Sequence, residues 1–275
     1  MAEHAEQIDN PSQDGTWMVT IPKTELNDLP AAKFKGKIFV IDTLYAAEAA
    51  ARILNEEKVI GFDTETKPNF RRGMNNKVSL LQLSTHRECF LIRLNKIGLP
   101  ESIKKVLESE SISKIGVSIH DDFHNLDKLF KLRPGGFVEL QEYVKDYKIA
   151  DNSLSRIYAV LFNQRISKNQ RLTNWEAEEL TSHQQEYAAL DAQACISIYE
   201  YLESGVFVPE DSKHYSFIPA PEHHDREKSA DKDKSVDKEK AAGQTPAAET
   251  PKPRPRPKRK RGGNKKESKP ATKNK

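Results

Sequence analysis

The sequence predicts an α/β fold in which helices flank a mixed β-sheet. Short apolar segments with strand character cluster between residues 37 and 94, so several early strands with antiparallel pairing among them are expected. A further strand comes next, and amphipathic helical patterns then extend to residue 203. With 275 residues, 36% hydrophobic and 31% charged, the chain has room for one sizeable domain with polar extensions.

The first half of this domain is predicted to be rich in strands. Thr43 is a suitable N-cap for a helix that runs to about Asn55. The link that contains His86 is short, so the strands on either side of it are expected to form a hairpin. The expected strands are KIFVI at 37–41, VIGFDTE at 59–65, KVSLLQLS at 77–84 and ECFLIRL at 88–94.

Helices are predicted to dominate the second half. Ser182 and Gln185 have the spacing of a capping box, which indicates the start of a long helix. A buried strand is expected at 112–119, and the expected helices cover 101–108, about 121–131, 152–162 and 181–203.

The composition divides the chain into three parts. Residues 34–207 have the mixed pattern of a folded domain, and residues 1–33 are predicted to be an irregular lead-in. Residues 208–275 are rich in Lys, Asp, Glu, Pro and Ala, which predicts a disordered charged tail. From residue 251 onward the tail has 12 Lys or Arg and one acid, a net charge of +11; because the whole chain carries +3, the other 250 residues carry −8.

The two cysteines, Cys89 and Cys195, are too few for a disulfide framework and lack metal-ligand spacing, which favours a reducing compartment. The first residues show no signal-peptide pattern, and no apolar run approaches the roughly 20 residues of a membrane span. We therefore expect a soluble, cytoplasmic protein, with the nucleus as the alternative in a eukaryote. We expect nucleic acid with a 3′ end as the partner and no membrane partner, and the sequence identifies no obligate protein partner.

Asp63 and Glu65 stand at the end of an apolar strand. Strand residues two apart share a face, so both carboxylates are expected on one face and Thr64 on the other. Two carboxylates at the exit of a central strand repel each other unless a cation compensates them, and Mg²⁺ or Mn²⁺ prefers such oxygen ligands. Taken alone, the tripeptide favours a simpler interpretation, in which two exposed acids end a strand.

A second acidic motif, His-Asp-Asp-Phe, begins a predicted helix. Asp122 shares a helical stripe with Leu126 and Leu129 and is expected to face the sheet. Asp121 falls on a polar stripe, where an acid near a helix N-terminus complements the helix dipole.

The third motif places Tyr187 and Asp191 four residues apart on one face of the last predicted helix. That face continues through apolar residues, so it is expected to be buried, and a buried carboxylate needs a partner such as a metal ion. Tyr187 alone would be interpreted as a core aromatic.

Together the motifs direct four acids and one tyrosine towards one sheet. Two cations about 3.5–4 Å apart at such a site activate a water and stabilise the leaving oxygen of a phosphodiester. A tyrosine hydroxyl beside that water orients it and assists its deprotonation.

These motifs resemble those of the tyrosine-bearing branch of the DEDD 3′-5′ exonuclease superfamily. VIGFDTET is similar to its first motif, KIGVSIHDDFHNL to its second and RISKNQRLTNWEAEELTSHQQEYAALDA to its third, and KVSLLQLS matches the strand after the first. The chain is similar to the Werner-syndrome-type exonuclease domain and, more distantly, to ribonuclease D. The similarity covers roughly residues 34–207.

The resemblance implies an RNase H-like fold, two divalent cations (Mg²⁺ or Mn²⁺) and release of nucleoside 5′-monophosphates from a 3′ end. It also implies a catalytic set consisting of Tyr187 and the metal ligands Asp63, Glu65, Asp122 and Asp191. Relatives often have aspartate at the position of Glu139, which lies outside this set. Trp175 and Leu172 are expected to pack near the helix of the third motif. Lys168 and Arg171 are candidates for contact with the nucleic-acid backbone, with simple solvation as the alternative.

Three other interpretations remain. The substrate is DNA or RNA, with DNA favoured and a ribonuclease D-like RNA-processing enzyme as the alternative. A catalytically weak nucleic-acid-binding protein is the non-enzyme reading, although all five catalytic positions are filled. His120 and His124 are spaced like zinc ligands, but Asp121 replaces the glutamate of that motif and no third ligand is evident.

The basic tail is a candidate nucleic-acid-binding segment. Alternation of Pro with Arg keeps it extended, and its charge would bind phosphates with steep salt dependence. Nuclear targeting and a solvated tail without a role are the alternatives. The residues expected to contact nucleic acid are Arg254, Arg256, Lys258, Arg259, Lys260 and Arg261.

Overall fold

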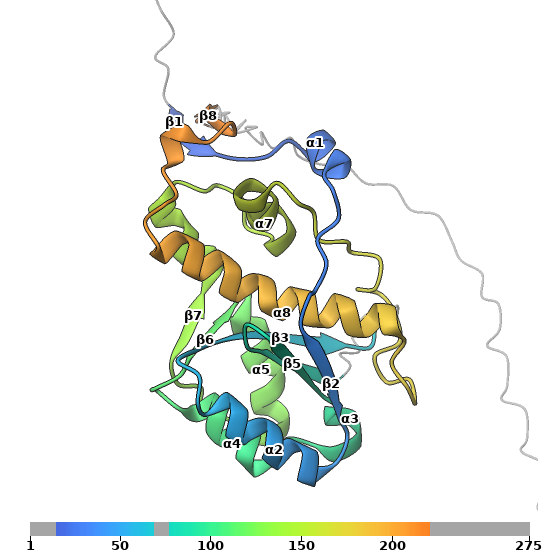
Figure 1. Ribbon diagram of the computed structural model, residues 1–275. Coiled ribbons are helices and arrows are strands. Elements are labelled where there is room, and N and C mark those ends of the chain that lie inside the picture. Colours follow the sequence, from blue (N-terminus) through green and yellow to red (C-terminus); the bar gives the residue numbers. More distant parts are fainter. Residues whose placement is uncertain (1–14, 69–76, 221–275) are drawn as a thin grey trace, which may run out of the picture. The chain divides into compact units, whose positions relative to one another are not determined.

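The computed structural model describes residues 15–68 and 77–220 (Figure 1). Its centre is a six-stranded mixed sheet with the strand order β2-β5-β4-β3-β6-β7. The strands are β2 (Lys37–Ile41), β3 (Val59–Thr66), β4 (Val78–Ser84), β5 (Glu88–Ile92), β6 (Ser113–Gly116) and β7 (Phe137–Glu139). The predicted mixed sheet flanked by helices is therefore confirmed.

Antiparallel pairs form the middle of the sheet, and parallel pairs complete it on both sides. β3, β4 and β5 are antiparallel neighbours, and the hairpin between β4 and β5 is the one predicted around His86. β2 pairs with β5, β6 with β3 and β7 with β6, all in parallel. β3 lies inside the sheet between β4 and β6, which explains the continuous apolar run at its start.

Helices cover both faces of the sheet (Figure 1). One face carries α2 (Leu44–Leu54), α4 (Glu101–Glu108) and α5 (Ile119–Phe130), and the other carries the long α8 (Ser182–Glu203) with α7 (Leu154–Phe162) beyond it. Ile60 and Phe62 of β3 pack in the core on the α2 and α4 side. The short elements are α3 (Leu94–Ile97), α6 (Leu140–Tyr143), η1 (Val144–Tyr147) and η2 (Pro209–Asp211).

Gly61 lets α8 lie directly against β3. A Cβ atom added at Gly61 would stand 1.8 Å from the carbonyl oxygen of Ala192, so no side chain fits between the strand and the helix. Gly61 shares its strand face with Asp63 and Glu65. The glycine therefore brings α8, with Asp191 next to Ala192, close to the strand that carries two of the predicted metal ligands.

The ends of the described chain differ from the prediction. Part of the segment expected to be an irregular lead-in forms β1 (Gly15–Val19) and α1 (Lys23–Asp28), and β8 (Tyr215–Pro219) forms inside the segment expected to be a disordered tail. β1 and β8 pair antiparallel in a sheet of their own. Regular structure therefore extends beyond the expected boundaries at 34 and 207, and a strand pair between such distant segments leaves no local signal in the sequence.

Buried residues fix the N-terminal segment on the domain. Val19 and Ile21 are fully buried beside Ile149, and the Asp151 carboxylate accepts a hydrogen bond from the Ile21 amide at 3.0 Å. Arg156 completes this link through an ion pair with Asp151. Residues 1–14 and the basic tail, including its six named Arg and Lys, lie outside the described residues.

Two local boundaries also differ. The capping box of α8 uses Thr181 and Gln184, one residue before the predicted pair, since the Thr181 hydroxyl accepts from the Gln184 amide at 3.2 Å. β6 ends at Gly116, and α5 already begins at Ile119, so the strand expected at 112–119 is shorter.

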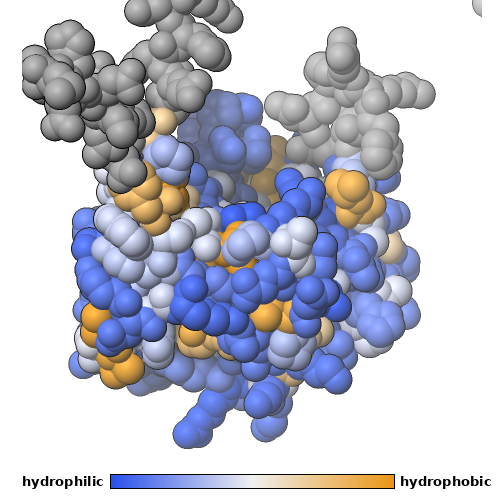
Figure 2. All heavy atoms as spheres, turned by 90° about the horizontal axis from the view of Figure 1, so that it is seen from above, coloured by the Kyte–Doolittle hydropathy of each residue, from blue (hydrophilic) through white to orange (hydrophobic). Residues whose placement is uncertain are grey.

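The face seen in Figure 2 is mostly hydrophilic, with small separate apolar patches. Among the described residues, no helix has both the length and the apolar composition that a membrane span requires.

Candidate active site

Three carboxylates converge where β3 meets α8. Asp63 and Glu65 share the β3 face that α8 covers, and Asp191 reaches them from the helix. One oxygen from each of these three residues lies within 4.8 Å of the other two. Glu65 is 9% exposed and Asp191 6% exposed, so the negative charges are largely removed from water.

Asp122 reaches the same strand from its opposite face. The hydroxyl of Thr64 donates a hydrogen bond to the Asp122 carboxylate, which holds α5 against the end of β3. Asp122 is half-buried and Asp121 is exposed, the orientations that helical periodicity predicts. Asp122 lies outside the group of three converging oxygens, although its charge raises the pKa values of Asp63 and Glu65.

Burial and mutual repulsion disfavour the fully ionised form of this cluster. Burial raises the pKa of Asp63 well above its usual range, and the charges of Asp191 and Glu65 raise it further. Burial together with Asp191 raises the pKa of Glu65 to about 9. The pKa values of Asp122 and Asp191 rise to about 7, again mainly through burial. Buried carboxylates in mutual contact are neutralised either by protons or by a bound cation.

The donor set fits a hard divalent cation. All candidate ligands are carboxylate oxygens, which Mg²⁺ and Mn²⁺ prefer. The Oδ1 atom of Asp191 is buried and has no hydrogen-bond partner among the described residues. His120 and His124 are both exposed, and neither belongs to the metal-ligand group found in the described part of the chain.

Tyr187 lies one helical turn before Asp191. Its hydroxyl opposes the rise of the Asp191 pKa, as do the positive charges of Lys168 and Arg171. Burial and the neighbouring acids Asp191 and Glu65 raise the pKa of Tyr187 well above its usual range. The tyrosine therefore keeps its proton near neutral pH.

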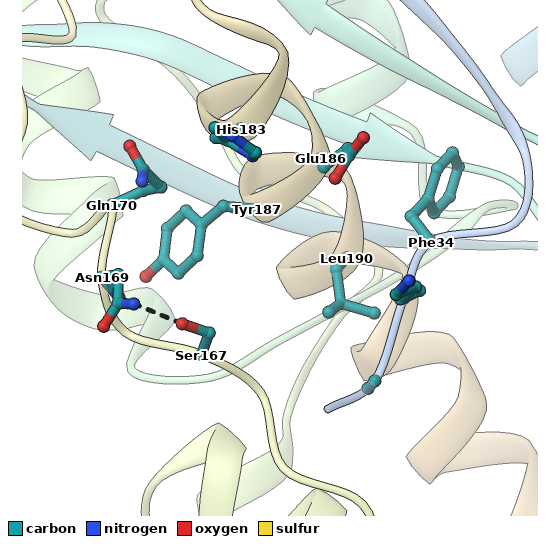
Figure 3. Close-up of a pocket in the computed structure, with 10 residues that line it drawn as sticks. Phe34, Ser167, Asn169, Gln170, His183, Glu186, Tyr187 and Leu190 are labelled. Carbon is teal, nitrogen blue, oxygen red and sulfur yellow. Dashed lines mark hydrogen bonds between the residues drawn. The ribbon is translucent and has the colours of Figure 1, made fainter. Parts of the chain in front are cut away.

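Figure 3 shows Tyr187 projecting from α8 towards the loop that carries Ser167, Asn169 and Gln170. A cavity of about 190 Å³ opens on this side of the ring. Its remaining lining comes from α8 and from the segment before β2, namely Ala32, Lys33, Phe34, His183, Glu186 and Leu190.

Of the two residues expected to pack near α8, Trp175 does so and Leu172 does not. Trp175 is fully buried and its ring centroid lies 6.1 Å from that of Tyr187. Leu172 is 68% exposed, so the expectation that it packs near the helix was wrong. Lys168 and Arg171, which precede Leu172 in this loop, are exposed as well.

Gln82 is a residue of the site that the sequence motifs do not identify. It pairs with Asp63 across the antiparallel strands and is fully buried, and both polar atoms of its amide are without a partner in the described structure. Opposite residues of such a pair share a face at close range. The signal was present in the sequence, because an amide in the apolar run SLLQLS occupies a buried position of a central strand.

Glu139 is the second residue whose importance was missed. Its carboxylate accepts hydrogen bonds from the backbone amides of Ser118 at 3.0 Å and Ile119 at 2.8 Å, at the start of α5. Ser118 has a φ of 61°, so the chain turns sharply there. Glu139 thus fixes the first turn of the helix that carries Asp122.

Comparison with known proteins gives a consistent result. A family model described as 3′-5′ exonuclease matches residues 38–206. The mouse bifunctional 3′-5′ exonuclease/ATP-dependent helicase WRN is 31% identical over 193 residues, which cover 66% of this chain but 14% of that protein. A 3′-5′ exonuclease from Arabidopsis thaliana is 27% identical, over 66% of this chain and 69% of that protein.

Solved structures agree on the fold. The exonuclease domain of Aedes aegypti Nibbler superposes with a TM-score of 0.55 at 20% identity, covering 66% of this chain and 96% of that one. Escherichia coli ribonuclease D gives a TM-score of 0.53 at 20% identity, covering 63% of this chain and 47% of that one. These neighbours share the RNase H-like arrangement of sheet and helices.

Proposed function

Since this chain belongs to the 3′-5′ exonuclease family, we propose that it hydrolyses phosphodiester bonds from the 3′ end of a nucleic acid with two bound cations, Mg²⁺ or Mn²⁺. The observation that carries this proposal is the convergence of Asp63, Glu65 and Asp191 within 4.8 Å. Enzymes of this family use divalent metal ions. When bound, the cations supply an activated water and stabilise the leaving oxygen.

The acidic residues of the cluster are assigned to two cation sites, and neighbouring residues hold them in position. The three converging carboxylates form one cation site, and Asp122, which interacts electrostatically with Asp63, contributes to the second. Thr64 and Glu139 hold Asp122 in place, through a side-chain hydrogen bond and through the first turn of α5.

Tyr187 orients the attacking water. Because its pKa is raised, the phenol is neutral and offers both a donor and an acceptor for hydrogen bonds. A neutral phenol fixes the direction of the water without adding negative charge to a cluster that already has four acids.

We propose DNA as the preferred substrate and RNA as the alternative. The relative WRN couples its exonuclease to a helicase, whereas a Trypanosoma brucei ribonuclease D, 20% identical to this chain, has been solved in complex with RNA U12. This chain covers a seventh of WRN's length, so the substrate of the whole relative does not transfer directly.

Cleavage of three nucleic-acid substrates tests the proposal. Single-stranded DNA, recessed duplex DNA and RNA of matched sequence, labelled at the 5′ end, are incubated with wild-type protein and Asp191→Asn. We expect stepwise shortening from the 3′ end and release of nucleoside 5′-monophosphates, dependent on Mg²⁺ or Mn²⁺ and lost in EDTA or in the variant. The absence of mononucleotide release from all three strands would reject the exonuclease proposal and favour a protein that only binds nucleic acid.

We also propose that the basic segment from residue 251 tethers substrate to the domain. It carries +11 whereas the rest of the chain carries −8, so the domain needs an additional source of affinity for a polyanion.

A further inference from the structure

A glutamine side chain is buried beside the carboxylate cluster. Gln82 belongs to β4, a central strand of the sheet, and is fully shielded from solvent. Its Nε2 and Oε1 atoms both lack a hydrogen-bond partner among residues 15–68 and 77–220. Burial of an amide without a hydrogen bond is unfavourable, whereas an apolar side chain at the same position carries no such cost. A neighbouring acceptor for Nε2 would therefore stabilise the amide at this position.

The strand register supplies such an acceptor. On β5 the residue directly opposite Gln82 is Leu91, which is apolar. On β3 the residue directly opposite is Asp63. Opposite residues of antiparallel strands have Cβ atoms about 4.5–5.5 Å apart and share a face of the sheet, a separation that a glutamine side chain can bridge. The amide and the Asp63 carboxylate are therefore within reach of each other.

Apolar side chains surround Gln82 on this face of the sheet. They come from β4, from β5 and from α8, which covers the face. Those assigned to one hydrophobic cluster here are Leu80, Leu91, Ala188 and Ala189. None of these side chains can accept a hydrogen bond, so the carboxylate of Asp63 is the acceptor that the strand register offers to Nε2.

The carboxylate of Asp63 can use a second donor. Its Oδ1 atom accepts a hydrogen bond from the backbone amide of Thr64 at 2.9 Å. Carboxylates that ligate a metal ion are commonly held by hydrogen bonds from neighbouring groups, which fix their orientation. A second bond from the opposite strand would hold the carboxylate more firmly than the bond to the adjacent backbone amide alone.

We infer that Gln82 is a positioning residue for Asp63, whose carboxylate accepts a hydrogen bond from the Gln82 Nε2 atom when the cluster holds a divalent cation. The inference rests on the proposed function and deepens it, because it assigns a part in cation binding to a residue outside the four acids. A carboxylate held in one orientation loses less conformational freedom when it ligates the cation, so the affinity is higher.

Replacement of the amide by an apolar side chain of similar length tests this role in the full chain. The affinity for Mn²⁺ is measured by calorimetry, and the Mn²⁺ concentration for half-maximal mononucleotide release is measured in the cleavage assay. Gln82→Met should weaken Mn²⁺ binding by about tenfold and raise that concentration by a similar factor. Gln82→Leu, which also lacks the amide, should show the same loss.

Urea denaturation separates positioning from a purely structural role. Because the amide has no partner among the described residues, Gln82→Met should be at least as stable as wild type in EDTA. Mn²⁺ should then stabilise the variant less than it stabilises wild type. The reverse pattern, with lower stability in EDTA and unchanged affinity for Mn²⁺, would overturn the inference. Failure of both variants to fold would also overturn it, since the fold itself would then require the amide.

Ser84→Ala is the matched control. Ser84 is buried on the same face of β4, two residues after Gln82, but it lies opposite Gly61 and its hydroxyl donates to the Thr85 carbonyl. Its replacement should leave the affinity for Mn²⁺ within about twofold of wild type.

The inference is also overturned if Gln82→Met and Gln82→Leu bind Mn²⁺ within twofold of wild type, if Ser84→Ala weakens binding as strongly, or if wild type binds no Mn²⁺. Cleavage by wild type together with unchanged affinity in the variants would reject the positioning role alone. Binding of Mn²⁺ that depends on Gln82, without cleavage of any strand, would instead reject the proposed exonuclease activity alone.

Discussion

The hydroxyl of Thr64 donates a hydrogen bond to the carboxylate of Asp122, across the strand from the face that carries Asp63 and Glu65. The middle residue of the Asp-Thr-Glu motif is thus a structural part of the site. Thr64 stands between the two acids of β3 and binds the acid that α5 supplies from the other side of the sheet. Acidic residues from both sides of the sheet are therefore held at the end of β3.

Thr64→Val should lower the rate of cleavage by about tenfold, because Asp122 loses a partner that fixes its orientation. Thr64→Ser, which keeps the hydroxyl, should restore most of the rate. Thr66→Val, two residues along the same strand, serves as the control. The measurement is the rate of mononucleotide release as a function of Mn²⁺ concentration. An unchanged metal dependence in Thr64→Val would show that the hydrogen bond has no role in holding Asp122.

Asp122→Asn should reduce cleavage by at least about a hundredfold, whereas Asp121→Asn should stay within about twofold. The reason is orientation: Asp122 is half-buried at the strand end, and Asp121 is exposed. Both variants are compared in the mononucleotide-release assay after thermal unfolding has shown that they fold. Equal losses in the two variants would contradict this assignment.

Glu65→Gln should stabilise the protein in EDTA, increasingly so as the pH rises. The folded state raises the pKa of Glu65 from 4.5 to about 9, so between these values the folded protein holds a proton that the unfolded chain has released. The free energy of unfolding therefore falls as pH rises through this window. Removing the group should make that slope shallower by up to about 1.4 kcal/mol per pH unit.

Urea denaturation at about pH 6 and about pH 8 measures this effect, with the exposed Glu48→Gln as the control. Mn²⁺ should stabilise wild type more than Glu65→Gln, because the variant has lost a ligand. A slope that is the same in both proteins would argue against a proton bound at Glu65.

The five proposed catalytic residues could be selected from the sequence because each lies on a face that strand or helix periodicity defines. Alternation along the strand places Asp63 with Glu65, and helical spacing separates Asp122 from Asp121. The hydrogen bond from Thr64 to Asp122 could not be predicted from the sequence, because the prediction requires knowing which helix covers the opposite face of β3. The position of Gln82 beside Asp63 follows from the register between two strands, which the sequence does not define. The contact of Glu139 with the start of α5 likewise depends on the path of the chain between β6 and α5. Pairing of β1 with β8 depends on contacts across the whole domain.

Deletion of residues 251–275 should weaken binding of single-stranded DNA at low salt and reduce the dependence of affinity on salt concentration. Turnover at saturating substrate should change little, because the carboxylate cluster is untouched. Fluorescence anisotropy across a salt series gives the first quantity and the mononucleotide assay the second. Equal affinity of the full and shortened chains at low salt would remove the tether from the proposal.

Deletion of residues 1–21 should lower the free energy of unfolding by several kcal/mol, since it removes the fully buried Val19 and Ile21, each worth about 1.5–3 kcal/mol. Deletion of residues 1–14 leaves β1 intact and should have little effect. Chemical denaturation of the two shortened proteins provides the comparison. Similar stability of both would mean that residues 15–21 contribute little to the stability of the domain.

The pairing of β1 with β8 also constrains how the domain is made. Val19 lies opposite Tyr215, so a strand synthesised early waits for nearly 200 further residues before its partner leaves the ribosome. Until then the apolar side chains of the N-terminal segment lack part of their cover. A ribosome-bound chain that ends before β8 should therefore remain open to proteases at its N-terminal segment, and closure should be among the last events of folding.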